Sequence, residues 1–188
     1  MQIYADNAAT TKPCKAAIQA MVSCMEQNYG NPSSVHHIGQ AAAEALLQAR
    51  QDIAACLGCS AREIYFTSGG SEADNQALRS AAYAGAKEGK KHIISTVIEH
   101  HAILHTLKQL EEEGFSVTLL EVSKTGIVTP EQVAAAIRPD TCLVSVMFAN
   151  NEIGTIEPIA EIGAVCREKG VLFHTCLLYT SPSPRDRQ

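Results

Sequence analysis

Alternation of short apolar stretches with longer amphipathic ones constrains the fold of this chain more than any other feature of its sequence. From residue 63 onward, four strand-like stretches are each followed by a helix-like one, and a fifth strand-like stretch closes the series. The expected strands are residues 64–67, 92–96, 115–122, 142–148 and 171–174, and the expected helices are residues 71–86, 101–113, 130–137 and 158–169. This order predicts an α/β fold with a mainly parallel sheet and flanking helices.

Two further helices are expected before this series. Apolar residues recur at helical spacing over residues 15–29 and 35–57, and the turn-forming run Gly30-Asn31-Pro32-Ser33-Ser34 separates them. We therefore expect an N-terminal helical segment at residues 1–62 and a sheet domain at residues 63–175. The remaining residues, 176–188, read CLLYTSPSPRDRQ and lack apolar periodicity after Tyr179, so they are expected to lie outside that domain.

Composition and charge exclude several classes of function. The 188 residues include 15 Lys and Arg against 20 Asp and Glu, a net charge of −5 without a basic block, which argues against a nucleic-acid or anionic-membrane partner. No apolar run approaches the roughly 18 residues that a membrane-spanning helix needs. The N-terminus lacks the features of a secretory signal, so the seven cysteines are expected to be reduced thiols in the cytoplasm.

Polar clusters follow four of the five expected strands. They are Ser68-Gly69-Gly70-Ser71, Glu99-His100, Asn150-Asn151-Glu152 and His174. Ligands of parallel sheets bind beyond the carboxyl ends of the strands, so these clusters are expected to form one site. Within it, Asn150 and Asn151 could donate to a ring oxygen or a carboxylate, or they could form an ordinary turn.

The glycine-rich turn leads from an expected strand into an expected helix. Glycines let the backbone approach a ligand closely and a helix N-terminus attracts anions, so the turn could hold a phosphate, with Ser71 adding a hydroxyl. The alternative is that Ser71 is an ordinary N-cap. The turn lacks both the Gly-Lys-Ser/Thr of a Walker A loop and the GxGxxG of a dinucleotide site.

The histidines after the second expected strand allow several interpretations. His100 could stack on a flat ring or move a proton, or it could cap the next helix. His101 and His105 have the i, i+4 spacing of metal ligands. No third ligand has a fitting spacing, so an exposed helix face is favoured and no metal site is predicted.

The cysteines carry no clear chemistry of their own. The pair Cys56 and Cys59 lacks a second CxxC, so we expect buried or partly buried thiols at the end of a helix rather than a zinc site. Cys142 and Cys166 lie in apolar stretches and are expected to be small core residues.

Six segments of the chain occur in one characteristic order. They are Ala5-Asp6-Asn7-Ala8-Ala9-Thr10-Thr11, Gly30-Asn31-Pro32-Ser33-Ser34 with His37 and Gly39, Phe66-Thr67-Ser68-Gly69-Gly70-Ser71-Glu72, Glu99-His100, Asn150-Asn151-Glu152-Ile153-Gly154 and His174-Thr175. In this order they resemble the N-terminal half of a cysteine desulfurase of the NifS/IscS-like group, within the class V aminotransferases. The resemblance covers residues 1–175 and implies the large domain of a fold-type I transferase that depends on pyridoxal 5'-phosphate.

The resemblance implies specific contacts with that cofactor. Gly70 and Ser71 would hold its phosphate. His100 would stack on its pyridine ring and, as the catalytic residue, help to move protons. Asn151 would bond its phenolic oxygen. The cofactor would supply the carbanion chemistry, and the protein would orient it.

The resemblance also implies a reaction and its partners. Asn7, Ala8 and Asn31 would line the substrate side, in a homodimer when full length. L-cysteine would become L-alanine, and its sulfur would remain on an enzyme cysteine as a persulfide. That sulfur would pass to acceptor proteins such as an iron–sulfur scaffold, for cluster assembly and tRNA thiolation.

The sequence departs from the family pattern at position 176. There Cys176 replaces an Asp that would pair with the pyridine nitrogen, and a neutral thiol cannot keep that nitrogen protonated. No lysine follows Lys169 to anchor the cofactor, and none of the seven cysteines matches the sulfur-accepting position. Residues 176–188 resemble a translated sequencing adaptor, so we expect a non-native tail on a truncated, inactive fragment.

Two alternatives stay open. A selenocysteine lyase or another class V aminotransferase would share these motifs, although Asn-Asn-Glu-Ile-Gly favours a desulfurase. A non-catalytic α/β binding or scaffold module is the alternative from a different class of function.

Overall fold

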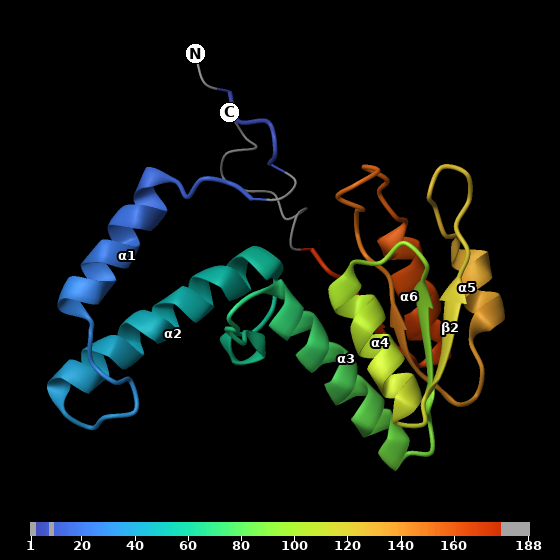
Figure 1. The fold of residues 1–188 in the computed structure, drawn as a ribbon. Helices are drawn as coiled ribbons and strands as arrows, with labels where there is room; N and C mark the ends of the chain where they lie inside the picture. The colour runs from blue at the N-terminus through green and yellow to red at the C-terminus, as the bar shows by residue number, and fades with distance from the viewer. Residues whose placement is uncertain (1–2, 8–9, 178–188) are drawn as a thin grey trace. The chain divides into compact units, whose positions relative to one another are not determined.

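The computed structural model describes residues 3–7 and 10–177, which belong to two compact units (Figure 1). The first unit reaches Phe66 and the second begins at Thr67. The two expected N-terminal helices belong to the first unit, and the alternating series belongs to the second. Most of the predicted tail, residues 178–188, lies outside the described residues.

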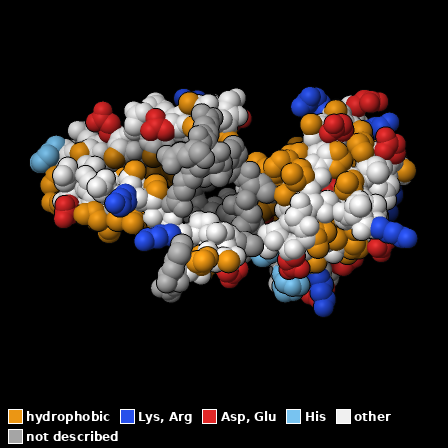
Figure 2. All heavy atoms as spheres, turned by 90° about the horizontal axis from the view of Figure 1, so that it is seen from above, with side chains coloured by type: hydrophobic (Ala, Val, Ile, Leu, Met, Phe, Trp, Pro, Cys, Tyr) orange, Lys and Arg blue, Asp and Glu red, His pale blue; other side chains and the backbone are white. Residues whose placement is uncertain are grey.

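The first unit is helical. It contains α1 (Lys15–Gln27), α2 (His37–Leu57) and the short 3-10 helix η1 (Ala61–Glu63). Gly58 ends α2 in the left-handed conformation, at φ 69°, which glycine adopts without strain. Hydrophobic side chains stand on the surface of this unit (Figure 2), including Met21 and Met25 of α1, a helix in which no residue is buried.

The second unit alternates helices and strands, as the sequence predicts. Its elements are α3 (Gly70–Lys87), β1 (His92–Thr96), α4 (His101–Glu112), β2 (Ser116–Leu120), α5 (Pro130–Ala136), β3 (Thr141–Ser145), α6 (Ile159–Lys169) and β4 (Leu172–His174). All pairings in the sheet are parallel, in the order β2-β1-β3-β4. Ile94 lies opposite Thr118 on one side and Val144 on the other, and Val144 lies opposite Phe173. The predicted α/β class is therefore confirmed.

Neighbouring residues of the central strands build two separate cores. Ile93 and Leu143 pack with side chains of α3 and α4, whereas Ile94 and Val144 pack with side chains of α5 and α6. Side chains alternate between the faces of a strand, so this division places one helix pair on each face of the sheet (Figure 1). Cys142 and Cys166 are buried, one in each core, as expected.

The first expected strand is absent. Residues 64–67 have no regular structure, and none of the four described strands pairs with them. Their apolar character favours a strand, but a strand forms only where a neighbour satisfies its backbone groups. Ile64 is buried, but Tyr65 is 75% exposed and Phe66 is also exposed, so the stretch is less buried than its composition suggests.

The expected burial of the thiols at the end of α2 is also wrong. Cys56 and Cys59 are both exposed. Ala54 is the buried residue nearest the end of α2. Cys56 follows it by two positions, so it lies about 200° around the helix axis, on the opposite face.

In the part of the chain that the structure describes, no helix combines the length and apolarity needed to cross a bilayer.

Candidate functional site

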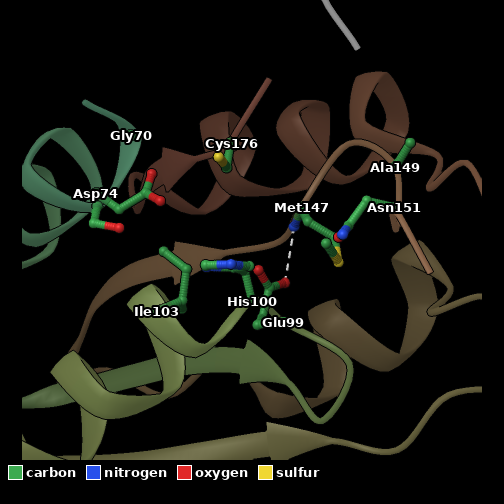
Figure 3. Close-up of a pocket in the computed structure, with 10 residues that line it drawn as sticks. Gly70, Asp74, Glu99, His100, Ile103, Met147, Ala149, Asn151 and Cys176 are labelled. Carbon is green, nitrogen blue, oxygen red and sulfur yellow. Dashed lines mark hydrogen bonds between the residues drawn. The ribbon is translucent and has the colours of Figure 1, made fainter. Parts of the chain in front are cut away.

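The sheet reverses its strand order between β1 and β3. The chain adds β2 on one side of β1, then crosses back to add β3 and β4 on the other side. At such a reversal the loops that leave the two strands diverge, and a crevice opens at the carboxyl edge of the sheet. A cavity of about 100 Å³ lies there (Figure 3), and a second hollow of about 320 Å³ shares Glu99, His100 and Asn151 with it.

The N-terminus of α3 forms one wall of the cavity. Gly70 and Ser71 both line it, and they are the first two residues of the helix. The interpretation of Ser71 as the N-cap is wrong, because Gly69 has that position and offers no side chain to cap the helix. The first N–H groups of an 18-residue helix are thus left without a side-chain cap, which favours an anion beside them.

His100 combines two of the roles that the sequence left open. Its Nδ1 atom accepts a hydrogen bond of 3.1 Å from the backbone N–H of Ala102, which makes His100 the N-cap of α4. Its ring also lines the cavity, where Figure 3 places it between Asp74 and Asn151. Because Nδ1 accepts, the neutral ring carries its hydrogen on Nε2, leaving that N–H to donate.

The two neighbouring asparagines have different positions. Asn150 is buried: its Oδ1 accepts from the N–H groups of Glu152 and Ile153, and its Nδ2 donates to the carbonyl of Ile98. These bonds fix the turn and tie the loop after β3 to the loop after β1. Asn151 lines the cavity, and its side-chain amide forms no hydrogen bond with another described residue, so it is the asparagine able to contact a ligand.

Glu99 is a further functional candidate. The sequence places it in the expected site together with His100 but indicates no role of its own. Its side chain is buried, and its Oε1 atom accepts from the backbone N–H of Met147 at 2.8 Å and from the Thr96 hydroxyl at 3.1 Å. Burial raises the pKa of Glu99 to about 7, with smaller contributions from the negative charges of Asp74 and Glu157. Its place directly before His100 was the one signal available.

A residue that sequence reasoning missed is Asp74, which lies on α3 and lines the cavity. Its Oδ1 atom is 3.5 Å from Nε2 of His174, whose Nδ1 is 2.9 Å from the hydroxyl of Ser145. These contacts connect α3, β3 and β4 beneath the cavity. Cys176, in the segment after β4, completes the wall on that side.

The residues assigned to the substrate side belong to the first unit. Ala8 lies outside the described residues, and Asn7 is exposed. Asn31 stabilises its own turn, since its Oδ1 accepts from the N–H of Ser33 at 2.9 Å. Their contact with a substrate stays a prediction.

The histidine pair on α4 matches the favoured interpretation. The rings of His101 and His105 stack with their centroids 5.3 Å apart, and both residues are exposed. They form an open helix face.

The described lining residues fit the non-covalent contacts of a phosphorylated aromatic ring. The helix start offers backbone donors, and a Cβ atom at Gly69 would meet no atom within 4 Å, so space is open beside it. His100 provides a flat surface and Asn151 an amide. No lysine lines either hollow among the described residues, and Cys176 has the place of the expected carboxylate.

The fold and this cavity define an α/β protein with a crevice at the switch point of its sheet. The family model for aminotransferase class-V matches residues 3–176. The chain therefore belongs to the class V aminotransferase family.

Curated relatives narrow the comparison to one branch of the family. The chain is 51% identical over 173 residues to a cysteine desulfurase IscS of Methanosarcina thermophila, covering 92% of this chain and 43% of that protein. It is 52% identical over 174 residues to a cysteine desulfurase IscS of Clostridium botulinum strain Kyoto, covering 93% and 44%. The chain thus spans less than half the length of these relatives.

Solved structures give the same picture. A NifS-like protein superposes with a TM-score of 0.89 at 38% identity, covering 93% of this chain and 48% of the other. The structure described as SspA in complex with cysteine superposes with a TM-score of 0.85 at 40% identity, covering 89% and 48%. The predicted fold-type I class and the resemblance to NifS and IscS proteins are confirmed.

Proposed function

We propose that this chain forms the cofactor-binding part of a pyridoxal 5'-phosphate-dependent cysteine desulfurase. One observation carries the proposal: Gly70 and Ser71 at the start of α3, His100 after β1 and Asn151 after β3 line a single cavity at the switch point of the sheet. The desulfurase relatives, at about half identity, support the same activity.

Each of these residues has a distinct part in the proposal. The backbone N–H groups at Gly70 and Ser71, with the Ser71 hydroxyl, bind the phosphate. The ring of His100 packs on the pyridine, and its Nε2 atom holds or moves a proton. The Asn151 amide bonds the phenolic oxygen. When bound, the cofactor supplies an electron sink for the carbanion chemistry.

The substrate we propose is L-cysteine, with sulfur passed to acceptor proteins such as an iron–sulfur scaffold. The names of the desulfurase relatives support cysteine as the substrate, and so does a structural neighbour described in complex with cysteine. We further propose a homodimer in the cytoplasm, with Asn7, Ala8 and Asn31 on the substrate side. By itself the 188-residue chain is proposed to be inactive, since no lysine follows Lys169.

A hybrid protein tests the proposal. Residues 1–175 are joined to the remaining part of the Methanosarcina thermophila relative, and sulfide and alanine released from L-cysteine are measured with added cofactor. We expect release of both products, and a much larger loss of turnover with His100→Ala than with the exposed control His101→Ala. Equal effects of the two substitutions would refute the role of His100. Preference for selenocysteine over cysteine would favour the lyase alternative.

A further inference from the structure

Glu99 is one of two buried acids in the wall of the cavity, and the proposed cofactor contacts leave it without a role. The residue is 6% exposed, as is Asp74, but Glu99 lines both the cavity and the adjoining hollow, whereas Asp74 lines the cavity without lining that hollow. Burial of a carboxyl group costs free energy unless it is hydrogen-bonded or neutral. The position of Glu99 therefore needs a physical explanation.

The hydrogen bonds of Glu99 are all made by one oxygen. Oε1 accepts from the N–H of Met147 and from the hydroxyl of Thr96, and the first of these bonds joins the loop after β1 to the loop after β3 (Figure 3). Oε2 accepts no hydrogen bond from any described residue. Since Glu99 lines the cavity, this second oxygen is the part of the carboxyl group available to a ligand.

The groups that surround Glu99 are more negative than positive. Asp74 faces it from α3 and is paired with His174 of β4, and Glu157 faces it from the segment before α6. Glu157 is itself buried, with its Oε1 atom lacking a partner among the described residues. His100 directly follows Glu99 in the sequence. The described walls of both hollows contain no Lys or Arg.

An anion bound at the start of α3 would add a further negative charge to this setting. Two negative charges in a poorly solvated site raise each other's proton affinity. A neutral Glu99 avoids that repulsion and has an O–H group to donate, whereas an ionised Glu99 has neither advantage.

We propose that Glu99 is a positioning residue that couples ligand binding in this cavity to a proton: the cavity takes up an anionic ring ligand when the Glu99 carboxyl is neutral, with its Oε2 hydroxyl facing the ligand. The inference rests on the proposed cofactor site. The proton comes from solvent when the ligand enters and returns to solvent when it leaves, and no covalent bond changes. The neutral-range pKa of Glu99 places this exchange close to physiological pH.

Binding of pyridoxine 5'-phosphate to the 188-residue chain tests the coupling, because this alcohol cannot react with surface lysines. Affinity is measured by calorimetry at pH 6 and pH 8, in two buffers with different ionisation enthalpies so that proton uptake is counted. We expect the affinity of the wild-type chain to fall up to about tenfold more than that of Glu99→Gln between these pH values. Glutamine keeps the Oε1 acceptor and cannot ionise.

Glu152→Gln is the matched control, because Glu152 is exposed and lines the adjoining hollow. It should keep the wild-type pH dependence and proton uptake.

Nuclear magnetic resonance of the wild-type chain gives a second test. The carboxyl carbon of Glu99 should titrate at higher pH when the ligand is present. This measurement requires no substitution at position 99, so it applies even if Glu99→Gln does not fold.

The outcomes separate the coupling from the cofactor site on which it rests. Equal pH dependence and proton uptake in wild type and Glu99→Gln, or a Glu99 titration that the ligand does not move, would overturn the coupling while binding itself persists. Absence of binding at either pH would instead overturn the proposed cofactor site, and the coupling with it.

Discussion

The Nε2 atom of His174 lies 3.5 Å from the Oδ1 atom of Asp74, and this contact joins the last strand of the sheet to α3. The other ring nitrogen of His174 contacts the buried hydroxyl of Ser145 on β3. A polar connection therefore runs from the sheet to the helix whose first residues line the cavity. It holds the start of α3 in register with the carboxyl ends of the strands.

Removing one member of this pair should destabilise the second unit. Asp74→Ala removes the carboxylate beside the mostly buried ring of His174, and we expect the free energy of unfolding to fall by about 1–3 kcal/mol. Urea unfolding followed by circular dichroism measures the change. The exposed substitution Glu112→Ala at the end of α4 should cost much less, and a similar cost for both would contradict the structural role of Asp74.

Two helical glycines offer a matched test of how closely the helices pack on the sheet. A Cβ atom at Gly85 of α3 would lie 2.3 Å from the Cβ atom of Cys142 on β3, so Gly85→Ala has to push the helix away. We expect a loss of about 1–3 kcal/mol. At Gly163 of α6 the nearest atom is 3.4 Å away, on the Phe173 ring, and the higher helix propensity of alanine should make Gly163→Ala neutral or stabilising. Equal thermal midpoints for the two variants would refute this packing.

The sequence predicted the sheet domain well because its pattern reflects burial. The short apolar runs Ile93-Ile94 and Cys142-Leu143-Val144 lie in β1 and β3, strands that are buried along their whole length. Gly170 ends α6 in the left-handed conformation, directly after residue 169, where the sequence predicts the end of that helix. Residues 64–67 misled the same reasoning, because apolar composition does not reveal whether a pairing partner exists.

The site could be predicted only in part. His100 and Asn151 follow β1 and β3, and topology alone brings the loops after such strands together. Gly70 reaches the same site from the start of α3, although the strand expected before it is absent. Asp74 was missed, and Glu99 was placed in the site without a role of its own, because their importance depends on contacts with residues far along the chain, His174 and Met147. The sequence also could not separate Asn150 from Asn151, since the difference lies in which amide the turn itself uses.

Acid should weaken the sheet through His92, which lies at the opposite end of β1 from the cavity. His92 is fully buried, and its two ring nitrogens contact the hydroxyls of Thr141 and Thr118 at 2.7 and 2.9 Å. Burial lowers its pKa below the ordinary value of 6.5, so the folded state prefers the neutral ring. Stability is therefore fully present above pH 6.5 and is lost as pH falls through the lowered pKa.

Comparison with His92→Gln isolates this contribution. Between pH 7.5 and pH 5.5, the wild-type chain should lose on the order of 1 kcal/mol more stability than the variant, which has no ring to protonate. Urea unfolding at both pH values gives the difference. His105→Gln, at an exposed ring, should follow the wild type; a variant at position 92 that loses as much stability as the wild type would remove His92 as the cause.

Glu99 should give the opposite dependence on pH. Its folded-state pKa of about 7 lies above the ordinary 4.5, so the folded state binds the proton more tightly than the unfolded state does. Its contribution is fully favourable below pH 4.5 and is lost as pH rises through about 7, where the buried carboxyl ionises.

Glu99→Gln removes that ionisation and keeps the oxygen that accepts from Met147 and Thr96. Relative to wild type, the variant should therefore gain roughly 1–3 kcal/mol between pH 5 and pH 8, as measured by urea unfolding without ligand. A constant difference between the two proteins across this range would mean that Glu99 ionises in the folded state as readily as an exposed acid, and that the cavity wall does not hold its proton.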